Sequence, residues 1–284
     1  MERQKRVAAI QDISGFGKCS LTVALPVLSA AGIETSVVPS AVLSTHTGGF
    51  TNFTYRDLTD DLHPFMKHWQ SLDITFDAIY SGFLGSFEQI EILSEFFDTF
   101  GTSENIILVD PVMADNGELY KIFTPDFATA MRTLCRKADI IVPNITEACL
   151  LAGEPYADGP YSEPYIRSLL KKLSDMGPNQ IVLTGVFFND RELGAATWER
   201  ATDSMTCQMA EKIPGYYHGT GDVFGSALLA ALLNGFDLPS ATRIAVRYTV
   251  TAIRRTHEAQ TDPRFGVDFE RSIPSLLKEL KLTV

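Results

Sequence analysis

Residues 105–112 read NIILVDPV, a short run of apolar and β-branched side chains that ends in an Asp-Pro pair. A run of this kind, without two-residue alternation, is typical of a strand buried on both faces. Further runs share this character and are bounded by turn residues: RVAAIQDI (6–13), ETSVVPSAVL (34–43), FDAIYSG (76–82), ADIIVPN (138–144) and QIVLTGV (180–186). The sequence therefore predicts a sheet of short, buried strands.

Helix-like segments lie between these runs, at 19–31, 56–70, 87–100, 124–136, 146–152 and 163–176. Such alternation predicts a parallel sheet with right-handed crossovers. After Thr184, the stretches GAATWER and SMTCQMAEKIP predict a two-stranded antiparallel continuation. Two helices, 221–234 and 239–255, are expected to finish the chain. Because the sequence has no linker and no internal repeat, we expect one domain over residues 1–284.

Composition limits the classes of partner. The chain has 284 residues and a net charge of −11, which argues against nucleic acid as a partner because a phosphate backbone needs a basic face. The cysteines show no C-x-x-C spacing and are expected to be reduced thiols. No apolar stretch reaches the roughly 18 residues of a membrane span, and the first apolar run is too short for a signal peptide. We therefore expect a cytoplasmic protein that binds neither membrane nor nucleic acid.

Polar residues and glycines follow directly after the apolar runs, in the segments 12–15, 44–49, 81–86, 110–113, 143–147 and 184–185. In open α/β sheets, ligands bind beyond the carboxyl ends of the strands. The sequence therefore predicts that these segments form a ligand site. His46 lies in one of them, within a Ser/Thr/Gly loop, and is a candidate for contact with a substrate.

The segment HGTGDVFGS (218–226) leads straight into the apolar stretch ALLAALLNG. Its glycines permit turn conformations and a close approach to a ligand. The free N–H groups at a helix start, at the positive end of the helix dipole, form an anion site. Asp222 is expected in the first helical turn beside that site. A plain capping role for this aspartate is the alternative interpretation.

A phosphoryl-transfer site needs a base for the alcohol proton, donors for the phosphoryl charge and a metal ion between the phosphates. The turn 219–222 would supply the base and the donors. Asp110, Asp115 and Glu147 are candidate carboxylates for Mg²⁺, which takes one or two of them and keeps several waters. Alternatively, Asp110 ends a strand in a turn, and Glu147 forms a helix cap with Asn144.

Two nucleotide motifs are absent from the glycine-containing segment near the start. A phosphate loop needs glycine at the position of Asp12 and Ser or Thr at the position of Cys19. A dinucleotide fingerprint needs a third glycine where Ser20 stands. The sequence therefore supports neither of these nucleotide sites.

Seven segments in order, IQDISGFGKCS, LSTHTGG, YSGFLGS, DPVM with Asp115, PNITE, VLTG and GTGD, resemble the ribokinase-like superfamily and, within it, the vitamin B6 kinases. The resemblance covers nearly the whole chain. It implies a three-layer α/β/α fold with a central, mainly parallel sheet and little or no β-lid, commonly in a homodimer. It also implies ATP as co-substrate, Mg²⁺, and a monovalent cation such as K⁺.

The resemblance also implies roles for single residues. Asp222 would deprotonate the 5′-hydroxymethyl group of a B6 vitamer, while the N–H groups of Gly219, Thr220 and Gly221 stabilise the transferring phosphoryl group. The implied ATP-binding residues are Asn144, Glu147, Thr184, Gly185, Thr220 and Gly221. The metal would be held around Asp110, Asp115 and Glu147. The implied substrate-binding residues are Asp12, Ser14, Ser44, His46, Thr47 and Phe83.

Two departures keep the substrate open. Asp12 stands where B6 kinases often carry Ser, and Phe83 stands where they often carry Tyr. The Asp-x-Ser-Gly of 12–15 resembles instead the hydroxymethylpyrimidine kinases of thiamin synthesis, but these typically carry Cys at the position of Asp222. Asp222 thus favours a B6 kinase, and a carboxylate at position 12 suits the amine of pyridoxamine. The alternatives are a hydroxymethylpyrimidine kinase, an enzyme with both activities, a sugar kinase of the superfamily, or an inactive ligand-binding protein.

Overall fold

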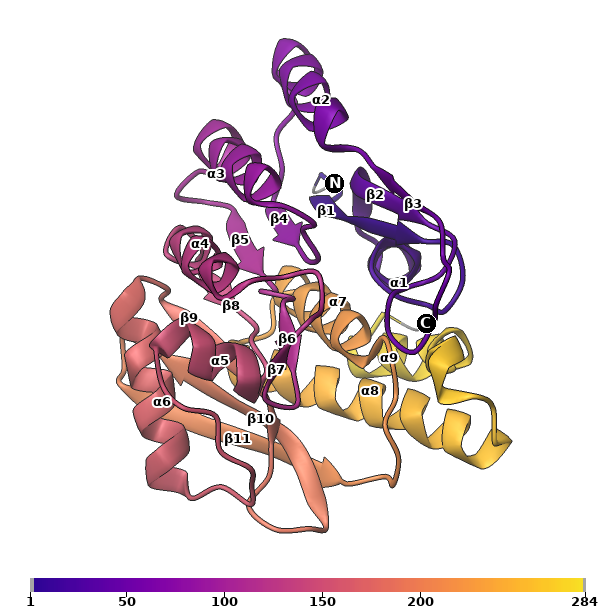
Figure 1. Ribbon diagram of the computed structural model, residues 1–284, viewed down its shortest axis with the longest axis vertical. Helices are drawn as coiled ribbons and strands as arrows, with labels where there is room; N and C mark the ends of the chain where they lie inside the picture. Colours follow the sequence, from indigo (N-terminus) through magenta and orange to yellow (C-terminus); the bar gives the residue numbers. More distant parts are fainter. Residues whose placement is uncertain (1–2, 283–284) are drawn as a thin grey trace. The chain divides into compact units, whose positions relative to one another are not determined.

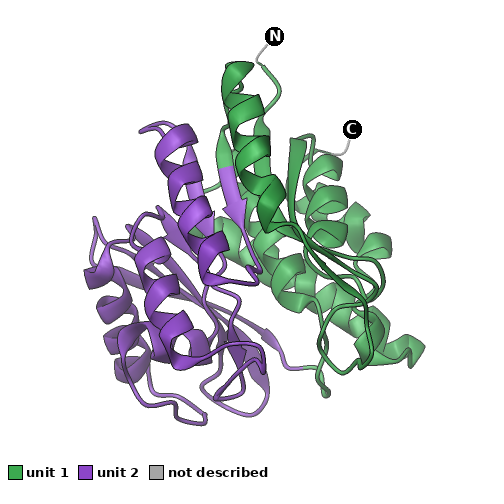
Figure 2. Cartoon of the chain, turned by 45° about the horizontal axis from the view of Figure 1, so that its top comes forward, with its two compact units in different colours: residues 1–78, 213–284 green, residues 79–212 purple. Residues whose placement is uncertain are grey.

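The computed structural model describes residues 3–282 (Figure 1). By internal contacts the chain divides into two compact units (Figure 2). Unit 1 comprises residues 1–78 and 213–284, and unit 2 comprises residues 79–212. Unit 1 therefore joins the two ends of the chain, and unit 2 is its continuous middle.

Unit 1 is built on β1 (Arg6–Ser14), which pairs in parallel with β2 (Glu34–Leu43); β2 in turn pairs antiparallel with β3 (Tyr55–Asp57). The register of β1 against β2 shifts between Gln11 and Ile13, so an irregularity falls at Asp12. Such bulges re-aim the side chains beside them. The helices of this unit are α1 (Leu21–Ala30), α2 (Thr59–Ser71), α7 (Thr220–Leu233), α8 (Leu238–Ala259) and α9 (Ile273–Glu279).

Helix α7 is the central helix of unit 1. Its residues from Val223 to Ala231 are all buried, and both α1 and α8 pack against it. A helix that is apolar all round is stable only inside a core. The polar first turn of α7 is consequently held in place by the burial of everything that follows it.

In unit 2 the strands follow the order β11-β10-β9-β8-β5-β4. β5, β8 and β9 run parallel, and β10 and β11 continue them antiparallel. The strands are β4 (Ala78–Ser81), β5 (Ile106–Val109), β8 (Ile140–Ile141), β9 (Gln180–Val186), β10 (Glu192–Glu199) and β11 (Ser204–Glu211). The helices are α3 (Phe87–Phe100), α4 (Pro125–Cys135), α5 (Ile145–Ala152) and α6 (Glu163–Met176).

The predicted fold class, a mainly parallel sheet flanked by helices in the α/β/α manner of the ribokinase-like superfamily, is confirmed. Each predicted strand is present, although the run 138–144 forms only the two residues of β8. The antiparallel pair after Thr184 is also confirmed. One domain over 1–284 stays a prediction. Within residues 3–282, no helix is long and apolar enough to cross a membrane.

Two expectations about the course of the chain are wrong. The chain does not finish with two helices, because α9 follows α8 after short 3-10 turns at Pro263–Phe265 and Glu270–Ser272. Burial of Leu276 and Leu280 stabilises this last helix. The sequence was also expected to form no strand between the runs 105–112 and 138–144, but a small hairpin of β6 (Ala114–Asp115) and β7 (Glu118–Leu119) lies there. Its Asn-Gly turn at 116–117 has positive φ at both residues, as tight hairpins require.

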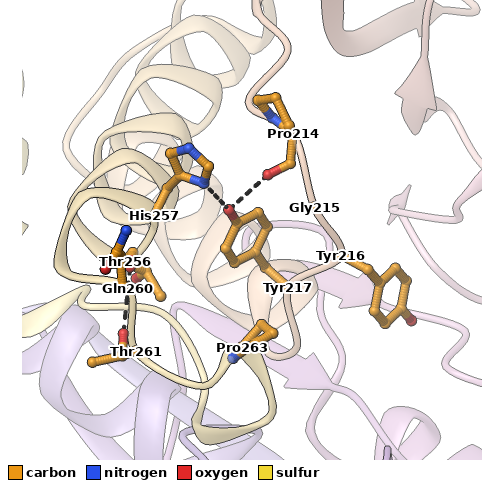
Figure 3. A pocket seen from close by; sticks show the side chains of 9 residues that line it. All are labelled: Pro214, Gly215, Tyr216, Tyr217, Thr256, His257, Gln260, Thr261 and Pro263. Atoms are coloured by element: carbon orange, nitrogen blue, oxygen red, sulfur yellow. Dashed lines mark hydrogen bonds between the residues drawn. The ribbon is translucent and has the colours of Figure 1, made fainter.

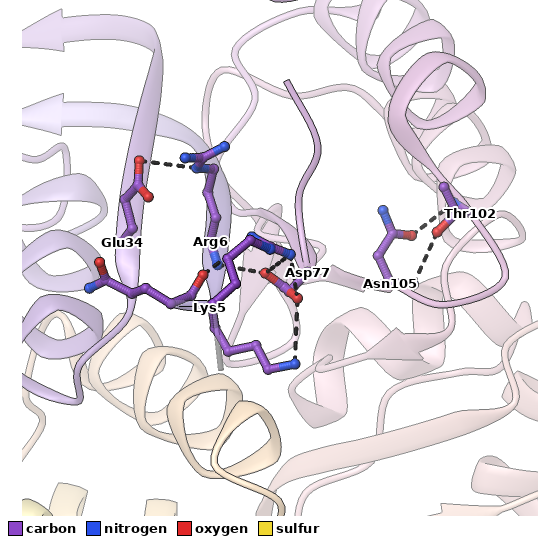
Figure 4. Close-up of polar contacts among 8 residues, drawn as sticks. Lys5, Arg6, Glu34, Asp77, Thr102 and Asn105 are labelled. Carbon is purple, nitrogen blue, oxygen red and sulfur yellow. Dashed lines mark hydrogen bonds and ion pairs between the residues drawn. The ribbon is translucent and has the colours of Figure 1, made fainter. Parts of the chain in front are cut away.

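Asp77 anchors the start of β1. Its carboxylate accepts the backbone N–H of Arg6 at 2.7 Å and pairs with the side chains of Arg3 and Lys5 (Figure 4). Partial burial alone would raise the pKa of Asp77, but the Arg6 hydrogen bond and the two cations lower it overall. The charged form of Asp77 therefore stabilises the fold.

Replacing Asp77 by Ala is expected to reduce the free energy of unfolding by roughly 1.5–3 kcal/mol, the range for a hydrogen bond to a charged group. Because folding lowers this pKa, the loss is expected in full at neutral pH and shrinks as the pH falls through the folded pKa. Urea denaturation at several pH values measures it. Asp98→Ala is the control, since Asp98 makes an exposed pair with Lys137 worth about 0–1 kcal/mol. Equal losses in the two variants contradict the assignment.

Candidate active site

The turn before α7 has the geometry expected of an anion site. Gly219 is the N-cap of α7 and adopts the left-handed conformation, with φ of 74° and ψ of 4°. Among the described residues, no side-chain hydrogen bond caps this helix at its N-cap, so the N–H groups of Thr220 and Gly221 suit an anion, whereas the N–H of Asp222 bonds its own carboxylate. Thr220 and Gly221 open the helix, and Asp222 lies in its first turn. The turn thus combines hydrogen-bond donors with a carboxylate.

Asp222 and Asp12 are connected through Ser20. The backbone N–H of Ser20 donates to the carboxylate of Asp222, and the hydroxyl of Ser20 donates to Oδ1 of Asp12. The hydroxyl of Ser14 donates to the other oxygen, Oδ2, of Asp12 at 2.9 Å. The end of β1, the start of α1 and the start of α7 therefore meet at two carboxylates.

Burial decides the electrostatics of this pair. Loss of solvation raises the pKa of Asp222 to about 7; the nearby charge of Asp12 raises it further, while the Ser20 N–H acts in the opposite direction. Burial also raises the pKa of Asp12, against the hydrogen bonds from Ser20 and Ser14. A carboxylate with a pKa near neutrality is able to accept a proton from an alcohol and return it to water.

The loop after β2 carries the predicted substrate residues Ser44, His46 and Thr47. His46 is buried, and both of its ring nitrogens are engaged: Nδ1 accepts the N–H of Gly48 at 3.1 Å, and Nε2 donates to the carbonyl of Arg264 at 2.7 Å. His46 therefore links this loop to the C-terminal segment, and its ring packs against those of Phe50 and His218. Ser44 and Thr47 are exposed, and the Ser44 hydroxyl accepts the N–H of Thr54.

An aromatic cluster surrounds His46. The Phe16 and Phe265 rings lie 5.0 Å apart, Phe50 stacks on Phe265 at 6.4 Å, and Phe50 meets His46 edge-on at 4.9 Å. Phe16 is 51% exposed and Phe265 is 42% exposed, so the cluster presents ring surface to solvent. Flat aromatic ligands bind favourably to such surfaces. This cluster and the Asp12–Asp222 pair all belong to unit 1.

Unit 1 also contains a cavity of about 300 Å³ on the segment that leads into the Gly219 turn. Its walls come from residues 214–217 and from the end of α8 with the turn after it (Figure 3). The Tyr217 hydroxyl donates to the Pro214 carbonyl at 2.8 Å and lies 2.9 Å from Nδ1 of His257. These bonds hold the segment between β11 and α7 in a fixed course.

In unit 2, the predicted ATP and metal residues gather at the start of α5. Asn144 and Glu147 form a capping box: Asn144 Oδ1 accepts the Glu147 N–H, and Glu147 Oε2 accepts the Asn144 N–H, both at 2.9 Å. The backbones of Asn144 and Thr184 form an isolated parallel β-bridge, and Gly185, which follows Thr184, has a positive φ. The capping interpretation of Glu147 is therefore confirmed.

Glu147 is also the anchor of the β6–β7 hairpin. Its Oε1 accepts the N–H of Met113 at 3.1 Å and that of Ala114 at 3.5 Å. Burial raises the pKa of Glu147 to about 8, against these hydrogen bonds, and the charge of Asp115 raises it further. Asp110 is buried at the end of β5. Within residues 3–282, no three His, Cys, Asp or Glu side chains are grouped to hold a metal ion by themselves.

Phe83 belongs to unit 2, unlike the other predicted substrate residues. It is buried after β4, and its ring lies 5.9 Å from that of Phe123. The structure thus brings the predicted residues together in two groups. The unit 1 group is Asp12, Ser14, His46, Gly219, Thr220, Gly221 and Asp222, and the unit 2 group is Asp110, Asp115, Asn144, Glu147, Thr184 and Gly185.

The phosphomethylpyrimidine kinase family matches residues 36–265 of the chain. The chain belongs to this family. Among its relatives, the pyridoxine/pyridoxal/pyridoxamine kinase of Bordetella avium (strain 197N) is 28% identical over 267 residues, which cover 90% of this chain and 86% of that protein. The family is one of kinases, so the chain is a phosphotransferase that binds a nucleotide.

Solved structures of this kinase family superpose closely. A Bacteroides thetaiotaomicron protein assigned as a phosphomethylpyrimidine kinase and crystallised with pyridoxal is 36% identical, with a TM-score of 0.92 and coverage of 96% of both chains. Pyridoxal kinase from Lactobacillus plantarum is 31% identical, with a TM-score of 0.89 and coverage of 97% of this chain and 98% of that chain. The predicted likeness to vitamin B6 kinases of the ribokinase-like superfamily is confirmed.

Two residues of this kinase site were missed from the sequence. From the sequence, Ser20 and Cys19 are only positions at which nucleotide motifs fail, and Cys19 is in addition an expected reduced thiol. Burial raises the pKa of the Cys19 thiol, and the charges of Asp222 and Asp12 raise it further, so Cys19 lies close to both carboxylates. The signal in the sequence was the crowding of small residues between Asp12 and the first helix.

Gly219→Ala is expected to remove most activity and to destabilise unit 1. An added Cβ would lie 2.2 Å from the Lys18 carbonyl oxygen, in a left-handed conformation that favours glycine. Gly32→Ala is the matched control, because Gly32 has φ of 81° with open space around it. Strain alone costs roughly 1–2 kcal/mol, so the control should lose less stability than Gly219→Ala and keep its turnover. Thermal unfolding and kcat measure both effects; equal behaviour would argue against close packing of the turn.

Proposed function

We propose that this kinase transfers the γ-phosphoryl group of ATP to the 5′-hydroxymethyl group of vitamin B6: pyridoxal, pyridoxamine or pyridoxine. The observation that carries the proposal is the Asp222–Ser20–Asp12 arrangement at the start of α7. Asp222 has a pKa suited to a general base, and Asp12 suits a cationic amine or ring nitrogen. The relative crystallised with pyridoxal supports this substrate class.

In the proposed reaction, Asp222 accepts the hydroxyl proton while the substrate oxygen forms a bond to the γ-phosphorus. The bond from that phosphorus to the bridging oxygen breaks, and ADP leaves with the electron pair. The N–H groups of Gly219, Thr220 and Gly221 donate to the transferring group, whose charge they stabilise more than water would. The aromatic cluster around His46 would hold the flat ring of the substrate.

As the resemblance implies, we assign roles in ATP binding to Asn144, Glu147, Thr184 and Gly185 and, separately, to Thr220 and Gly221. The cavity beside residues 214–217 lies on the segment that leads into the anion-binding turn and suits a further part of the nucleotide.

Asp110, Asp115 and Glu147 would hold Mg²⁺, not all of them directly, because this ion keeps several waters. The fit rests on charge: a carboxylate at 147 whose pKa is raised by burial and by its neighbour Asp115 is stabilised by a cation. When bound, Mg²⁺ supplies charge neutralisation between the β- and γ-phosphates. K⁺ and a homodimer remain expectations from the resemblance, and a cytoplasmic location remains an expectation from the composition of the sequence.

A second candidate is hydroxymethylpyrimidine kinase, alone or beside the B6 activity. The observation that favours it is the Asp12-x-Ser14-Gly15 end of β1, in which Ser14 holds the Asp12 carboxylate. The family description points the same way. Both candidate substrates are flat nitrogen heterocycles with a primary alcohol, so both suit the same site.

The acceptor is identified by an ADP-release assay with Mg·ATP and K⁺, using pyridoxal, pyridoxamine, pyridoxine and hydroxymethylpyrimidine separately. We expect turnover with the B6 vitamers, and pyridoxamine among the good acceptors because of the carboxylate of Asp12. Asp12→Asn run on the same panel is expected to lose pyridoxamine activity selectively. Turnover mainly with hydroxymethylpyrimidine would make the second candidate correct.

Asp222→Asn is expected to reduce kcat by roughly 10²–10⁴-fold, the usual contribution of a positioned general base. The base must be ionised, so wild-type kcat should rise with pH through about 7, and this limb should vanish in the variant. Asp237→Asn is the matched control. Asp237 also lies at a helix start, as the N-cap of α8, and Asn caps equally well. Near-normal kcat in a folded Asp222→Asn enzyme would overturn the assigned role.

A further inference from the structure

Ser20 has a backbone conformation that is costly for any residue other than glycine. Its φ is 54° and its ψ is −129°. Non-glycine residues in such regions cost about 1–3 kcal/mol and persist only where the surrounding structure holds them. An isolated antiparallel bridge between Ser20 and Ile13 closes the loop that contains this strained residue.

Each polar group of Ser20 has a partner. Its carbonyl accepts the N–H groups of Val23 and Ala24, both at 2.9 Å, and so starts α1. Its hydroxyl donates to Asp12, and its N–H donates to Asp222. Ser20 is 5% exposed, so these bonds are made away from bulk water, where their loss is costly. The strained conformation is the one that directs these groups toward three different elements.

The turn that carries the base packs directly on this segment. The ideal Cβ position of Gly219 lies 2.2 Å from the carbonyl oxygen of Lys18 and 3.4 Å from Sγ of Cys19. A shift of the backbone at 18–20 therefore displaces the turn or opens a gap beneath it. The orientation of Asp222 depends on the conformation of Ser20 through this packing as well as through the hydrogen bond.

We propose that Ser20 is a positioning residue that holds the side chains of Asp12 and Asp222 in a fixed position relative to each other. The carboxylate that receives the cationic group of the substrate is thereby kept in fixed register with the base that takes the alcohol proton. This inference rests on the proposed function, because it assigns those two roles to Asp12 and Asp222. Its substance is mechanical: the hydroxyl fixes one carboxylate, and the strained backbone fixes the other.

Four further side-chain relations describe the charged and titratable surroundings of Asp12, Ser20 and Asp222. Cys19 and Asp12 lie near Asp222, while His46 and Tyr55 lie near Asp12. Loss of the Ser20 N–H from Asp222 removes a bond to the charged form, which raises the pKa of that carboxylate. The base is then ionised only at higher pH.

Two substitutions separate the roles of the hydroxyl and the backbone. Ser20→Gly removes the hydroxyl but adopts the same φ and ψ without strain, so the N–H stays on Asp222. We expect KM for a cationic acceptor to rise about tenfold, with kcat nearly unchanged, since a bond to a charged group is lost. Ser20→Ala removes the hydroxyl that offsets the strain, so the backbone relaxes. We expect kcat at pH 7 to fall about tenfold as well. The rise of kcat with pH, which reports ionisation of Asp222, should move to higher pH.

Ser14→Ala is the matched control, because Ser14 bonds the same Asp12 carboxylate but not Asp222. It should raise KM without moving the rise of kcat with pH. Identical kcat and identical pH profiles for Ser20→Ala and Ser20→Gly would overturn the proposal. If Ser20→Ala does not fold, Ser20→Gly decides alone, and a large loss of kcat in it overturns the proposal. Each variant is measured with whichever acceptor the wild type uses, so a wrong vitamin assignment leaves this test intact.

Discussion

Two carboxylates, the buried Asp12 and the half-buried Asp222, meet at the end of β1 with Ser20 as their shared donor. Transferring a carboxylate out of water is costly unless hydrogen bonds or cations replace its hydration. The groups of unit 1 that bond these two carboxylates are neutral: two hydroxyls and backbone N–H groups. Neutral donors stabilise the anions only in part, so both pKa values remain raised. The two carboxylates are therefore more basic than usual. Ion pairs with cations would have lowered their pKa values instead.

Much of unit 1 serves this arrangement. The irregularity at Asp12 turns the end of β1, and the strained Ser20 begins α1 while facing both carboxylates. The buried length of α7 fixes the position of its own first turn. Unit 2 follows the same physical principle with Glu147, a buried carboxylate whose partners are backbone N–H groups of its own helix start and of the β6–β7 hairpin. In each unit, a desolvated acid organises the surrounding loops.

The order of strands and helices was predictable because burial on both faces leaves a plain signal, a continuous apolar run ended by turn residues. The GTGD turn was predictable for a similar reason, since two glycines directly before an apolar helix are typical of a turn that binds an anion. Ser20 was not predictable, because its importance lies in a φ value and in partners far along the chain. His46 illustrates the same limit: its position in a ligand loop is visible in the sequence, but the use of both ring nitrogens is not. The β6–β7 hairpin does leave a signal in the sequence, the Asn-Gly pair of its turn, but its strands of two residues each are too short to form an apolar run.

The nature of the site also narrows the substrate within the proposed class. The exposed rings of Phe16 and Phe265 suit a flat aromatic acceptor. A sugar would need more polar side chains to form hydrogen bonds with its hydroxyl groups. In the proposed function, Asp12 receives a cationic amine or ring nitrogen, and both vitamin B6 and the pyrimidine alcohol contain ring nitrogens. What separates the two candidates is therefore the base itself. In the proposed reaction, the Asp222 carboxylate, whose pKa is about 7, takes the proton from the alcohol directly, whereas the hydroxymethylpyrimidine kinases that the sequence resembles carry a thiol there. The chemistry of that one side chain favours vitamin B6.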